Sequence, residues 1–283
     1  MIYIGIPVYD ERHTIGPLLW RIRELFTELG REYRLLVVDD ASEDGTAEAL
    51  EPYRQYLPLT VLRHPERRGY AASVERLLRE TVARSAYLKR DGLITLQADF
   101  TDPPEALPEL VRRFEGGADL VLGVPPSDGK GGEEPEEAPK EEERREAAEA
   151  EGKARRTPAA VPRSVRIARF GARLVARGLP RPPGVAEPYG SLRLYRLFLV
   201  DRAIRDLESR DERLLTQEGW AANAELLLTV WPHARRVAEV EAGPDYGRRY
   251  RSTRLRTLAE LRSLRRAARE ARLRELAARL EVA

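Results

Sequence analysis

RLLVVDDASEDGT, residues 34–46, decides the fold class of this chain, because a short strand-like run leads directly into paired aspartates and then into signals for a helix start. Residues 34–38 predict a strand, since a short apolar run bounded by turn residues is typical of one that is buried on both faces. Thr46 begins a segment with helical spacing, and Ser42 or Asp44 would make a good N-cap for it. The stretch therefore predicts a strand, a polar loop and a helix.

The same alternation extends on both sides of this stretch. We predict strands at residues 2–8, 34–38, 59–63, 93–96 and 119–123, and helices at residues 14–29, 46–56, 70–86 and 104–114. Strands that alternate with helices in this way form an α/β fold, a mostly parallel sheet with helices on both faces. Ligands in such folds bind at the carboxyl ends of the strands, so the loops at those ends are the candidate site.

Beyond the fifth strand the alternation stops. Residues 127–157 contain 11 acidic and 7 basic residues, a net charge of −4, and their neighbours are mostly Gly, Pro and Ala. Such a composition predicts a solvated insertion with little buried apolar surface. The chain is thus divided into an α/β half at 1–124, a charged insertion at 125–158, a second half of the same domain at 159–253 and a basic amphipathic C-terminal helix at 254–283.

Composition excludes several classes of site. The chain has 283 residues, no cysteine and three histidines, so disulfides and thiolate metal sites are excluded, and any metal would need oxygen ligands of the kind that Mg²⁺ or Mn²⁺ prefers. No apolar stretch is long enough to span a membrane, and the N-terminus lacks the features of a secretory signal, which predicts a cytoplasmic location. The basic C-terminal segment lacks interleaved aromatic residues, which argues against nucleic-acid binding.

The first two polar loops follow the strands at residues 2–8 and 34–38. Pro7 cannot donate to a sheet ladder, so we expect it to end its strand, after which Tyr9 offers a ring and Glu11 a carboxylate. Glu11 could instead serve only as a charge beside a helix N-terminus. In the second loop, Asp39 and Asp40 stand where carboxylates can accept hydrogen bonds from a nucleobase or a ribose.

The third and fourth loops offer partners for phosphate and metal. The third, around Gly69 with Arg67 and Arg68, opens a helix and would suit phosphate, although an amphipathic helix start explains it nearly as well. In the fourth loop, strand alternation would place Gln97 and Asp99 on one face, where their oxygens could hold a divalent cation against a diphosphate. Asp102 follows, and we expect it to cap the helix that begins at the next two prolines.

Together the four loops resemble family 2 glycosyltransferases of the Rossmann-like GT-A fold. The most similar branch is the polyprenyl-phosphate type, which includes dolichyl-phosphate mannose synthases. The match of residues 39–46 to Asp-Asp-x-Ser-x-Asp-Gly-Thr is the most specific one. The resemblance is close over residues 2–123 and continues more weakly in four later segments, at 161–176, 189–196, 223–228 and 246–255.

The resemblance implies a set of site residues. It assigns nucleotide binding to Pro7, Tyr9, Glu11, Asp39, Asp40, Gln97 and Ala98. It assigns the metal to Asp99, with Gln97 and Thr101 beside it, and catalysis to Asp99, Arg193 and Glu225. It assigns the acceptor phosphate to Arg193, Ser191, Arg248, Ser252 and Arg254.

Three positions depart from the family pattern. Gln97 replaces the first aspartate of Asp-x-Asp, and an amide ligand without charge predicts weaker metal binding. The Gly-Ser-Arg that the family carries after its fifth strand is absent, so Arg163 or Arg166 would have to face phosphate instead. The acidic residue that precedes Ser-Gly-Phe-Arg in the family is displaced here to Glu187.

The resemblance implies a metal-dependent inverting glycosyltransferase that uses Mg²⁺ or Mn²⁺. The donor would be a nucleotide sugar of the GDP-mannose or UDP-glucose type, and the acceptor a polyprenyl or dolichyl phosphate. One alternative is a soluble sugar acceptor, which would require a carboxylate base such as Asp102, Glu187 or Glu225. A second alternative is a weakly catalytic protein that binds sugar nucleotides.

The C-terminal segment allows two interpretations. Leu258, Leu261, Leu264, Ala268 and Ala271 recur at helical spacing, Leu276 and Leu280 extend this stripe, and arginines fill most of the other positions. Such a helix could lie on an anionic membrane, which would give the protein a peripheral position at the inner face. Alternatively, the apolar side chains pack on the domain or on a second subunit of a homo-oligomer.

Overall fold

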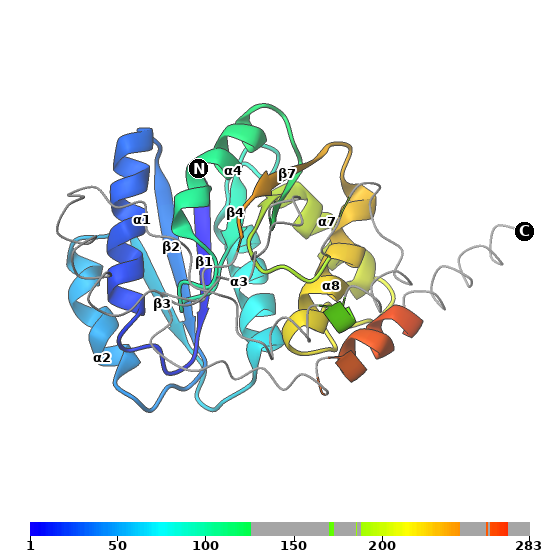
Figure 1. The fold of residues 1–283 in the computed structure, drawn as a ribbon, viewed down its shortest axis with the longest axis horizontal. Helices are drawn as coiled ribbons and strands as arrows, with labels where there is room; N and C mark the ends of the chain where they lie inside the picture. The colour runs from blue at the N-terminus through cyan, green and yellow to red at the C-terminus, as the bar shows by residue number, and fades with distance from the viewer. Residues whose placement is uncertain (126–169, 173–184, 186–187, 244–258, 260, 271–283) are drawn as a thin grey trace, which may run out of the picture.

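Strand β1 (Ile2–Val8) lies inside a seven-stranded sheet in which only one strand runs against the others (Figure 1). The computed structural model describes residues 1–125, 170–172, 185, 188–243, 259 and 261–270. The strand order is β3-β2-β1-β4-β6-β5-β7. The other strands are β2 (Tyr33–Asp39), β3 (Leu59–Arg63), β4 (Gly92–Thr95), β5 (Leu120–Val124), β6 (Arg193–Arg196) and β7 (Val237–Glu241).

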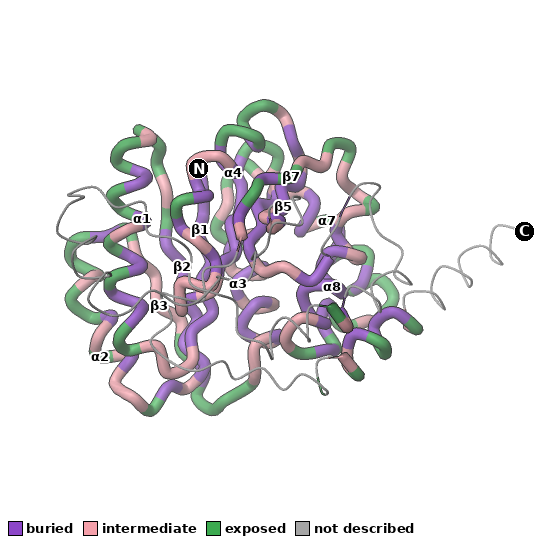
Figure 2. The backbone as a smooth tube through the Cα atoms, viewed as in Figure 1, coloured by how far each residue is buried: buried purple, intermediate pink, exposed green. Residues whose placement is uncertain are grey.

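Helices cover both faces of this sheet. The α-helices are α1 (Ile15–Leu29), α2 (Thr46–Leu50), α3 (Tyr70–Arg84), α4 (Leu107–Glu115), α7 (Leu197–Glu208) and α8 (Gly219–Val230), and the short 3₁₀ helices are η1 (Glu51–Gln55), η2 (Pro104–Ala106) and η3 (Trp231–His233). Alternation along β2 shows the two layers directly. Leu35 and Val37 pack in the core with α1, α2 and α4, whereas Leu36 and Val38 pack in the core with α3, α7 and α8. All four residues are buried, and the central strands are largely coloured as buried in Figure 2. A sheet buried between two helical layers confirms the predicted α/β fold.

The antiparallel pairing of β6 is a feature of the sheet that the local sequence pattern does not predict. It lies between β4 and β5 and pairs antiparallel with both, although it follows them by about 70 to 100 residues in the chain. Leu194 and Tyr195 point to opposite faces and are both buried. β6 therefore joins the two parallel parts of the sheet, which remains mostly parallel as expected.

Pro7 does not end its strand, contrary to the expectation. β1 continues through Val8, and Pro7 pairs in register with Val38. The amide of Ile2 donates toward the β2 side, so by alternation the missing amide of Pro7 would face β4. The pairing with β4 stops at Gly5, opposite Thr95. Pro7 is tolerated because the amide that it lacks has no ladder partner to lose.

The strand order places three loops at one edge of the sheet. From β1 the chain runs outward to β2 and β3 on one side, and then crosses to β4 on the other side. The carboxyl ends of β1, β2 and β4 therefore meet at a topological switch point, which is where ligands bind in open α/β sheets.

The described part of the C-terminal segment packs on the domain. Residues 261–270 are helical, and Leu264, Ala267 and Ala268 are buried in a cluster with side chains of α8 and with Tyr189. Four arginines of this helix are exposed, at positions 262, 265, 266 and 269. Packing on the domain thus explains this stretch, and the remaining apolar positions of the predicted stripe, Leu258, Ala271, Leu276 and Leu280, lie outside the described residues. Most of the predicted insertion, from residue 126 onward, also lies outside them.

Candidate active site

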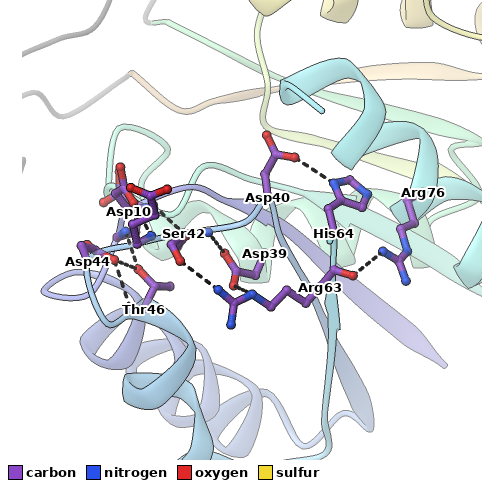
Figure 3. Close-up of polar contacts among 11 residues, drawn as sticks. Asp10, Asp39, Asp40, Ser42, Asp44, Thr46, Arg63, His64 and Arg76 are labelled. Carbon is purple, nitrogen blue, oxygen red and sulfur yellow. Dashed lines mark hydrogen bonds and ion pairs between the residues drawn. The ribbon is translucent and has the colours of Figure 1, made fainter. Parts of the chain in front are cut away.

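Hydrogen bonds join the loop after β1 to the loop after β2 (Figure 3). The Asp10 amide donates to Ser42 Oγ at 2.8 Å, and Asp10 Oδ1 accepts from the Glu43 amide at 3.0 Å. The Glu11 amide donates to Thr46 Oγ1 at 2.8 Å. Asp10 is therefore a structural residue that sequence reasoning missed; its position one residue before Glu11 in the most polar part of the loop was the available signal.

Most side chains of the Asp-Asp-x-Ser-x-Asp-Gly-Thr motif hold backbone groups. Asp44 Oδ1 accepts from the amide and the hydroxyl of Thr46, while Asp44 Oδ2 accepts from the Arg12 amide at 3.1 Å. Gly45 is the residue that precedes α2, and its φ of +90° is a left-handed conformation that favours glycine. Ser42 and Asp44 thus shape the loop and bridge to its neighbour. Gly45 occupies the N-cap position of α2, and Asp44 accepts from the amide of Thr46, the first residue of that helix.

Asp39 and Asp40 differ in what they can offer a ligand. Asp39 is fully buried, accepts from the Ser42 amide at 3.0 Å and has Arg63 Nε 3.3 Å from its Oδ2. Its carboxylate holds the loop after β2 through the Ser42 amide and is covered by the protein. Contact of Asp39 with a nucleotide would therefore require this loop to open. Asp40 also has little exposure but lies at the end of β2, where its carboxylate accepts from His64 Nδ1 and from the amides of Arg68 and Gly69, each at 2.8 Å.

The N-terminus of α3 is satisfied by carboxylates of the protein. Asp40 takes the amides of Arg68 and Gly69, and Glu218 Oε2 accepts from the Ala71 amide at 3.1 Å. Glu218 reaches this position from the residue before α8. Burial raises the pKa of Glu218, while hydrogen bonds from the Ala71 and Tyr70 amides partly offset that effect. The amides of Gly69 and Ala71 at this helix start therefore already have acidic partners, which leaves fewer donors for the phosphate that the sequence suggests there.

Tyr9 and Arg67 form a cation–π pair next to the end of β1. The Arg67 guanidinium lies over the Tyr9 ring, with 4.0 Å from its central carbon to the ring centroid. Tyr9 directly follows β1, and the Asp40 amide donates to the Val8 carbonyl at 2.9 Å, so the two loop starts are neighbours. The predicted nucleotide residues Tyr9 and Asp40 are thus brought to the same corner of the sheet edge, and the Glu11 carboxylate, two residues after Tyr9, accepts from Thr14.

The loop after β4 adopts a turn instead of a continued strand. β4 ends at Thr95, two residues before Gln97, so strand alternation does not place Gln97 and Asp99. Asp99 Oδ1 accepts from the Thr101 amide at 3.0 Å, and Phe100 between them has a φ of +62°. Ala98 is buried in the core, so only its backbone could face a nucleotide.

The loop after β4 fits a metal site in which the protein supplies only some of the coordinating oxygens and a bound substrate supplies others. Among the described residues, no group of three or more His, Asp or Glu side chains is placed to hold a metal ion. Thr101 Oγ1 is buried and has no hydrogen-bond partner within the described part of the chain, and Asp99 is half-buried next to it. Mg²⁺ commonly uses one or two carboxylates and completes its shell with water and substrate phosphate oxygens. Asp99, Thr101 and Gln97 therefore fit the protein's share of such a site.

Asp102 connects two strand ends and does not cap a helix. Its Oδ2 accepts from the Gln97 amide at 2.8 Å and from Ser191 Oγ at 2.7 Å, and the 3₁₀ helix that begins at Pro104 has no side-chain cap. Burial raises the pKa of Asp102 to about 6, because the hydrogen bonds from Ser191 and the Gln97 amide offset only part of the desolvation. Ser191, predicted to contact the acceptor phosphate, is in this structure the donor to Asp102.

The raised pKa of Asp102 predicts that ionisation of this side chain destabilises the fold. Its pKa rises from 3.8 unfolded to about 6 folded, so the folded state holds the proton more tightly, and stability present below pH 4 is lost as pH rises through 6. The shift corresponds to about 3 kcal/mol. Urea unfolding with a chelator present should show the native chain losing stability relative to Asp102→Asn between pH 4 and pH 7.5. A difference between the two proteins that does not change with pH would contradict this assignment.

Arg193 lies inside the protein and does not face an acceptor. Its residue is 2% exposed, Nη1 donates to the Asn223 carbonyl at 2.6 Å, and Nη2 donates to the Pro188 carbonyl at 2.5 Å. Asn223 in turn accepts from Tyr70 Oη at 2.8 Å. To bind an acceptor phosphate with both Nη1 and Nη2, Arg193 would have to break its hydrogen bonds to the carbonyls of Asn223 and Pro188. The structure therefore supports a role for Arg193 in packing.

The Glu225 carboxylate is also occupied by hydrogen bonds inside the protein. It accepts from the amide and hydroxyl of Thr216, at 2.8 and 2.7 Å, and from the Gln217 amide at 3.1 Å. A carboxylate with three donors holds the segment before α8 and is poorly placed to take a proton from an acceptor. The other predicted acceptor residues, Arg248, Ser252 and Arg254, and the alternative base Glu187, lie outside the described residues.

Three site loops share an unusual backbone conformation. Asp10, Ala41 and Phe100 have φ values of +51°, +58° and +62°, and they lie in the loops after β1, β2 and β4. In the described chain, the one other non-glycine residue with positive φ is Asp211. Such conformations are costly for residues other than glycine and gather where a site fixes the backbone. The sheet edge that the sequence singles out is thus also the most constrained part of the backbone.

Comparison with known proteins gives one family match. The sequence profile of the family described as Glycosyl transferase family 2 matches residues 3–175. The chain is 30% identical over 122 residues to dolichol-phosphate mannosyltransferase of Pyrococcus furiosus, covering 43% of this chain and 32% of the relative. It is 33% identical over 123 residues to undecaprenyl-phosphate 4-deoxy-4-formamido-L-arabinose transferase of Edwardsiella ictaluri, covering 42% and 35%. The chain thus spans about a third of the length of the curated relatives that it matches.

The structural match extends further than the sequence match. Glucosyl-3-phosphoglycerate synthase of Mycobacterium tuberculosis, crystallised with Mn²⁺ and UDP-glucose, superposes with a TM-score of 0.59 at 20% identity and covers 96% of this chain and 78% of that one. At that level of identity the match shows the fold, and it confirms the GT-A expectation. Among the residues that the structure describes, no helix has the length and apolar character needed to cross a membrane.

Proposed function

Since the chain belongs to glycosyl transferase family 2, we propose that it transfers a sugar from a nucleotide donor to a polyprenyl phosphate with inversion at the sugar carbon. The observation that carries this proposal is the convergence of Tyr9, Asp40 and Asp99 at one edge of the sheet, in loops that hydrogen bonds and strained backbone hold in place. Such an edge suits a nucleotide, since it offers a ring, a base-reading carboxylate and a carboxylate for the diphosphate side.

On the donor side, the residues supply binding and position. Tyr9 and Asp40 lie together at the ends of β1 and β2 and would hold the base, while Asp99 and Thr101 at the end of β4 would hold Mg²⁺ or Mn²⁺. A divalent cation bound there would neutralise charge on the departing nucleoside diphosphate. The fixed loops would hold the donor in one orientation, which lowers the entropic part of the barrier.

On the acceptor side, the names of the relatives support a polyprenyl phosphate. The two sequence relatives are a dolichol-phosphate and an undecaprenyl-phosphate transferase. A phosphate acceptor is already anionic at neutral pH and needs no strong general base, which agrees with the engagement of Glu225 by three donors.

Asp102 supports a second candidate, transfer to a soluble sugar. Its pKa of about 6 is raised by burial, and its Oδ1 has no hydrogen-bond partner among the described residues. A carboxylate with these properties can take the proton of a sugar hydroxyl near neutral pH. This candidate predicts a transfer rate that rises with pH as Asp102 loses its proton. Transfer to a phosphate acceptor does not require this rise in rate.

Transfer assays with matched acceptors test the proposal. With one radiolabelled nucleotide sugar and Mn²⁺, we expect product on a short-chain polyprenyl phosphate and at least tenfold less on the corresponding polyprenol or on free sugars. The physical reason is that the phosphate oxygen is a charged nucleophile and the alcohol is not. Faster transfer to a free sugar, lost in Asp102→Asn, would favour the second candidate, and binding of donor without any transfer would leave a sugar-nucleotide-binding protein.

We further propose that the exposed arginines of residues 261–270 bring the chain to an anionic membrane, where a lipid acceptor resides. Because the apolar face of this helix is buried on α8, contact would be electrostatic, and each arginine would contribute about 1 kcal/mol or less. Vesicles with anionic lipid should co-sediment the chain, and 0.5 M salt should release it.

The matched variants for that test keep the helix packed. Replacing Arg262, Arg265, Arg266 and Arg269 with glutamine should weaken binding at least tenfold, whereas replacing four exposed arginines elsewhere, Arg54, Arg112, Arg113 and Arg205, should change it less. Equal losses in the two variants would show that net charge alone determines binding.

A further inference from the structure

The acceptor capacity of Asp40 determines what kind of base can bind beside it. A carboxylate has two oxygens with about four lone-pair sites between them. Asp40 Oδ1 accepts from His64 Nδ1 and from the Arg68 amide, and Oδ2 accepts from the Gly69 amide, each at 2.8 Å. Three sites are therefore filled by the protein, which leaves one site, on Oδ2.

The three donors to Asp40 are a buried side chain and two backbone amides. His64 is 2% exposed at the end of β3, and a carboxylate only accepts, so its Nδ1 carries the hydrogen. The two amides belong to the backbone just before α3. The Asp40 side chain is 5% exposed, so a ligand reaches it over a small area. Figure 3 shows its carboxylate hydrogen-bonded to the His64 ring. Asp40 therefore cannot turn both oxygens toward a base without losing partners inside the protein.

The common bases differ in the donors that they would bring to such a carboxylate. Guanine presents two parallel donors, its ring N1–H and its 2-amino group, and pairs with a carboxylate through both oxygens. Uracil presents a single ring N3–H between two carbonyl groups. Cytosine and adenine place an unprotonated ring nitrogen beside their amino group, so a lone pair would face a carboxylate oxygen. Of these edges, that of uracil matches one remaining acceptor site.

We propose that His64 and the amides of Arg68 and Gly69, by filling three acceptor sites of Asp40, make this site select uracil over guanine. This inference rests on the proposed function and deepens it, because it chooses between a UDP-sugar and a GDP-sugar donor. His64 is a positioning residue, since it acts on the base through Asp40. Arg67, stacked on Tyr9 in the same corner, is available to one of the two uracil carbonyl groups.

Calorimetry with a series of nucleoside diphosphates and Mg²⁺ on the full chain tests the selection. UDP should bind at least ten times more tightly than GDP, and 3-methyl-UDP, which lacks the N3–H, should lose at least tenfold relative to UDP. Inosine diphosphate, which lacks the 2-amino group of guanine, should bind no more weakly than GDP, because the site has no acceptor for that group. GDP binding as tightly as UDP, or more tightly than inosine diphosphate, would overturn the proposal.

Variants of His64 test the positioning role. His64→Leu frees the carboxylate to rotate, so UDP affinity should fall and the UDP-to-GDP ratio should move at least threefold toward one. His64→Asn keeps an N–H donor near the position of Nδ1 and should preserve the ratio. The control is Arg76→Ala, which removes a hydrogen bond to the Arg63 carbonyl in the same region without touching Asp40. A folded His64→Leu protein with an unchanged ratio would overturn the role of His64, and if that variant fails to fold, His64→Asn and the base series decide.

The outcomes separate this inference from the proposed function. Transfer from a GDP-sugar together with tighter binding of GDP would leave the glycosyltransferase proposal standing and overturn only the selection of uracil. Failure of every nucleoside diphosphate to bind would overturn both.

Discussion

Asp99→Ala is expected to lower glycosyl transfer on the order of 100- to 1,000-fold, because it removes the carboxylate that we assign to a cation at the diphosphate. Asp99 lies in the turn after β4, next to the buried hydroxyl of Thr101 that has no partner among the described residues. Calorimetry should show that the variant binds UDP or GDP equally with Mn²⁺ and with a chelator, whereas the native chain binds more tightly with Mn²⁺.

Two further substitutions make this result specific. Gln97→Asp adds a charged ligand to the same turn and should tighten Mn²⁺ at least tenfold. Glu105→Ala is the control, since Glu105 is an exposed carboxylate six residues further on that pairs with Arg21. If Asp99→Ala and Glu105→Ala behave alike, with metal-dependent binding unchanged, the metal lies elsewhere.

Arg193→Ala is expected to destabilise the fold by about 3–5 kcal/mol, the scale seen when a buried charged donor is removed and its partners stay behind. The loss would leave the carbonyl groups of Pro188 and Asn223 without their donor and would open a cavity beside Tyr195. Urea unfolding gives the free energy directly. Arg205→Ala, which removes an arginine that is 71% exposed on α7, should change it by less than about 0.5 kcal/mol.

Arg193→Lys separates packing from phosphate binding. A lysine keeps the charge but cannot serve both carbonyl groups with a planar pair of nitrogens. If Arg193 acts in packing, the variant should lose stability while its KM for the polyprenyl phosphate stays within about twofold of the native value. A large rise in that KM with unchanged stability would restore the role in acceptor binding that the sequence suggests.

Local patterns predict the fold well where strand and helix follow each other directly. Residues 34–38 predict a buried strand, and β2 covers them, because its alternate apolar residues pack into the helical layers on both faces of the sheet. β6 escapes prediction for the opposite reason. Its four residues pair with strands about 70 to 100 positions earlier, and no local period shows that this segment is inserted between them.

The sequence predicts the location of the candidate site well, but it predicts the roles of the individual residues less well. The loops carrying Tyr9, Asp40 and Asp99 do meet at one edge of the sheet, because the carboxyl ends of neighbouring parallel strands must. The roles within these loops depend on donors from elsewhere in the chain. The partners of Asp40 follow β3, and Glu218 reaches α3 from 147 residues away, so a sequence motif alone cannot tell a ligand-binding carboxylate from one that holds backbone.

The position of β6 sets the order in which the sheet can assemble. β5 pairs only with β6 and β7 among the described strands, and β4 pairs only with β1 until β6 arrives. At translation rates of about 5–20 residues per second, a chain emerging from the ribosome would hold β4 with one bare edge for roughly 5–20 s. During that interval strands β3, β2, β1 and β4 have all their mutual partners, while β5 lacks both of its neighbours and is an apolar segment of the kind that can aggregate. Completion of the sheet on that side of β4 therefore has to wait until β6 has been synthesised.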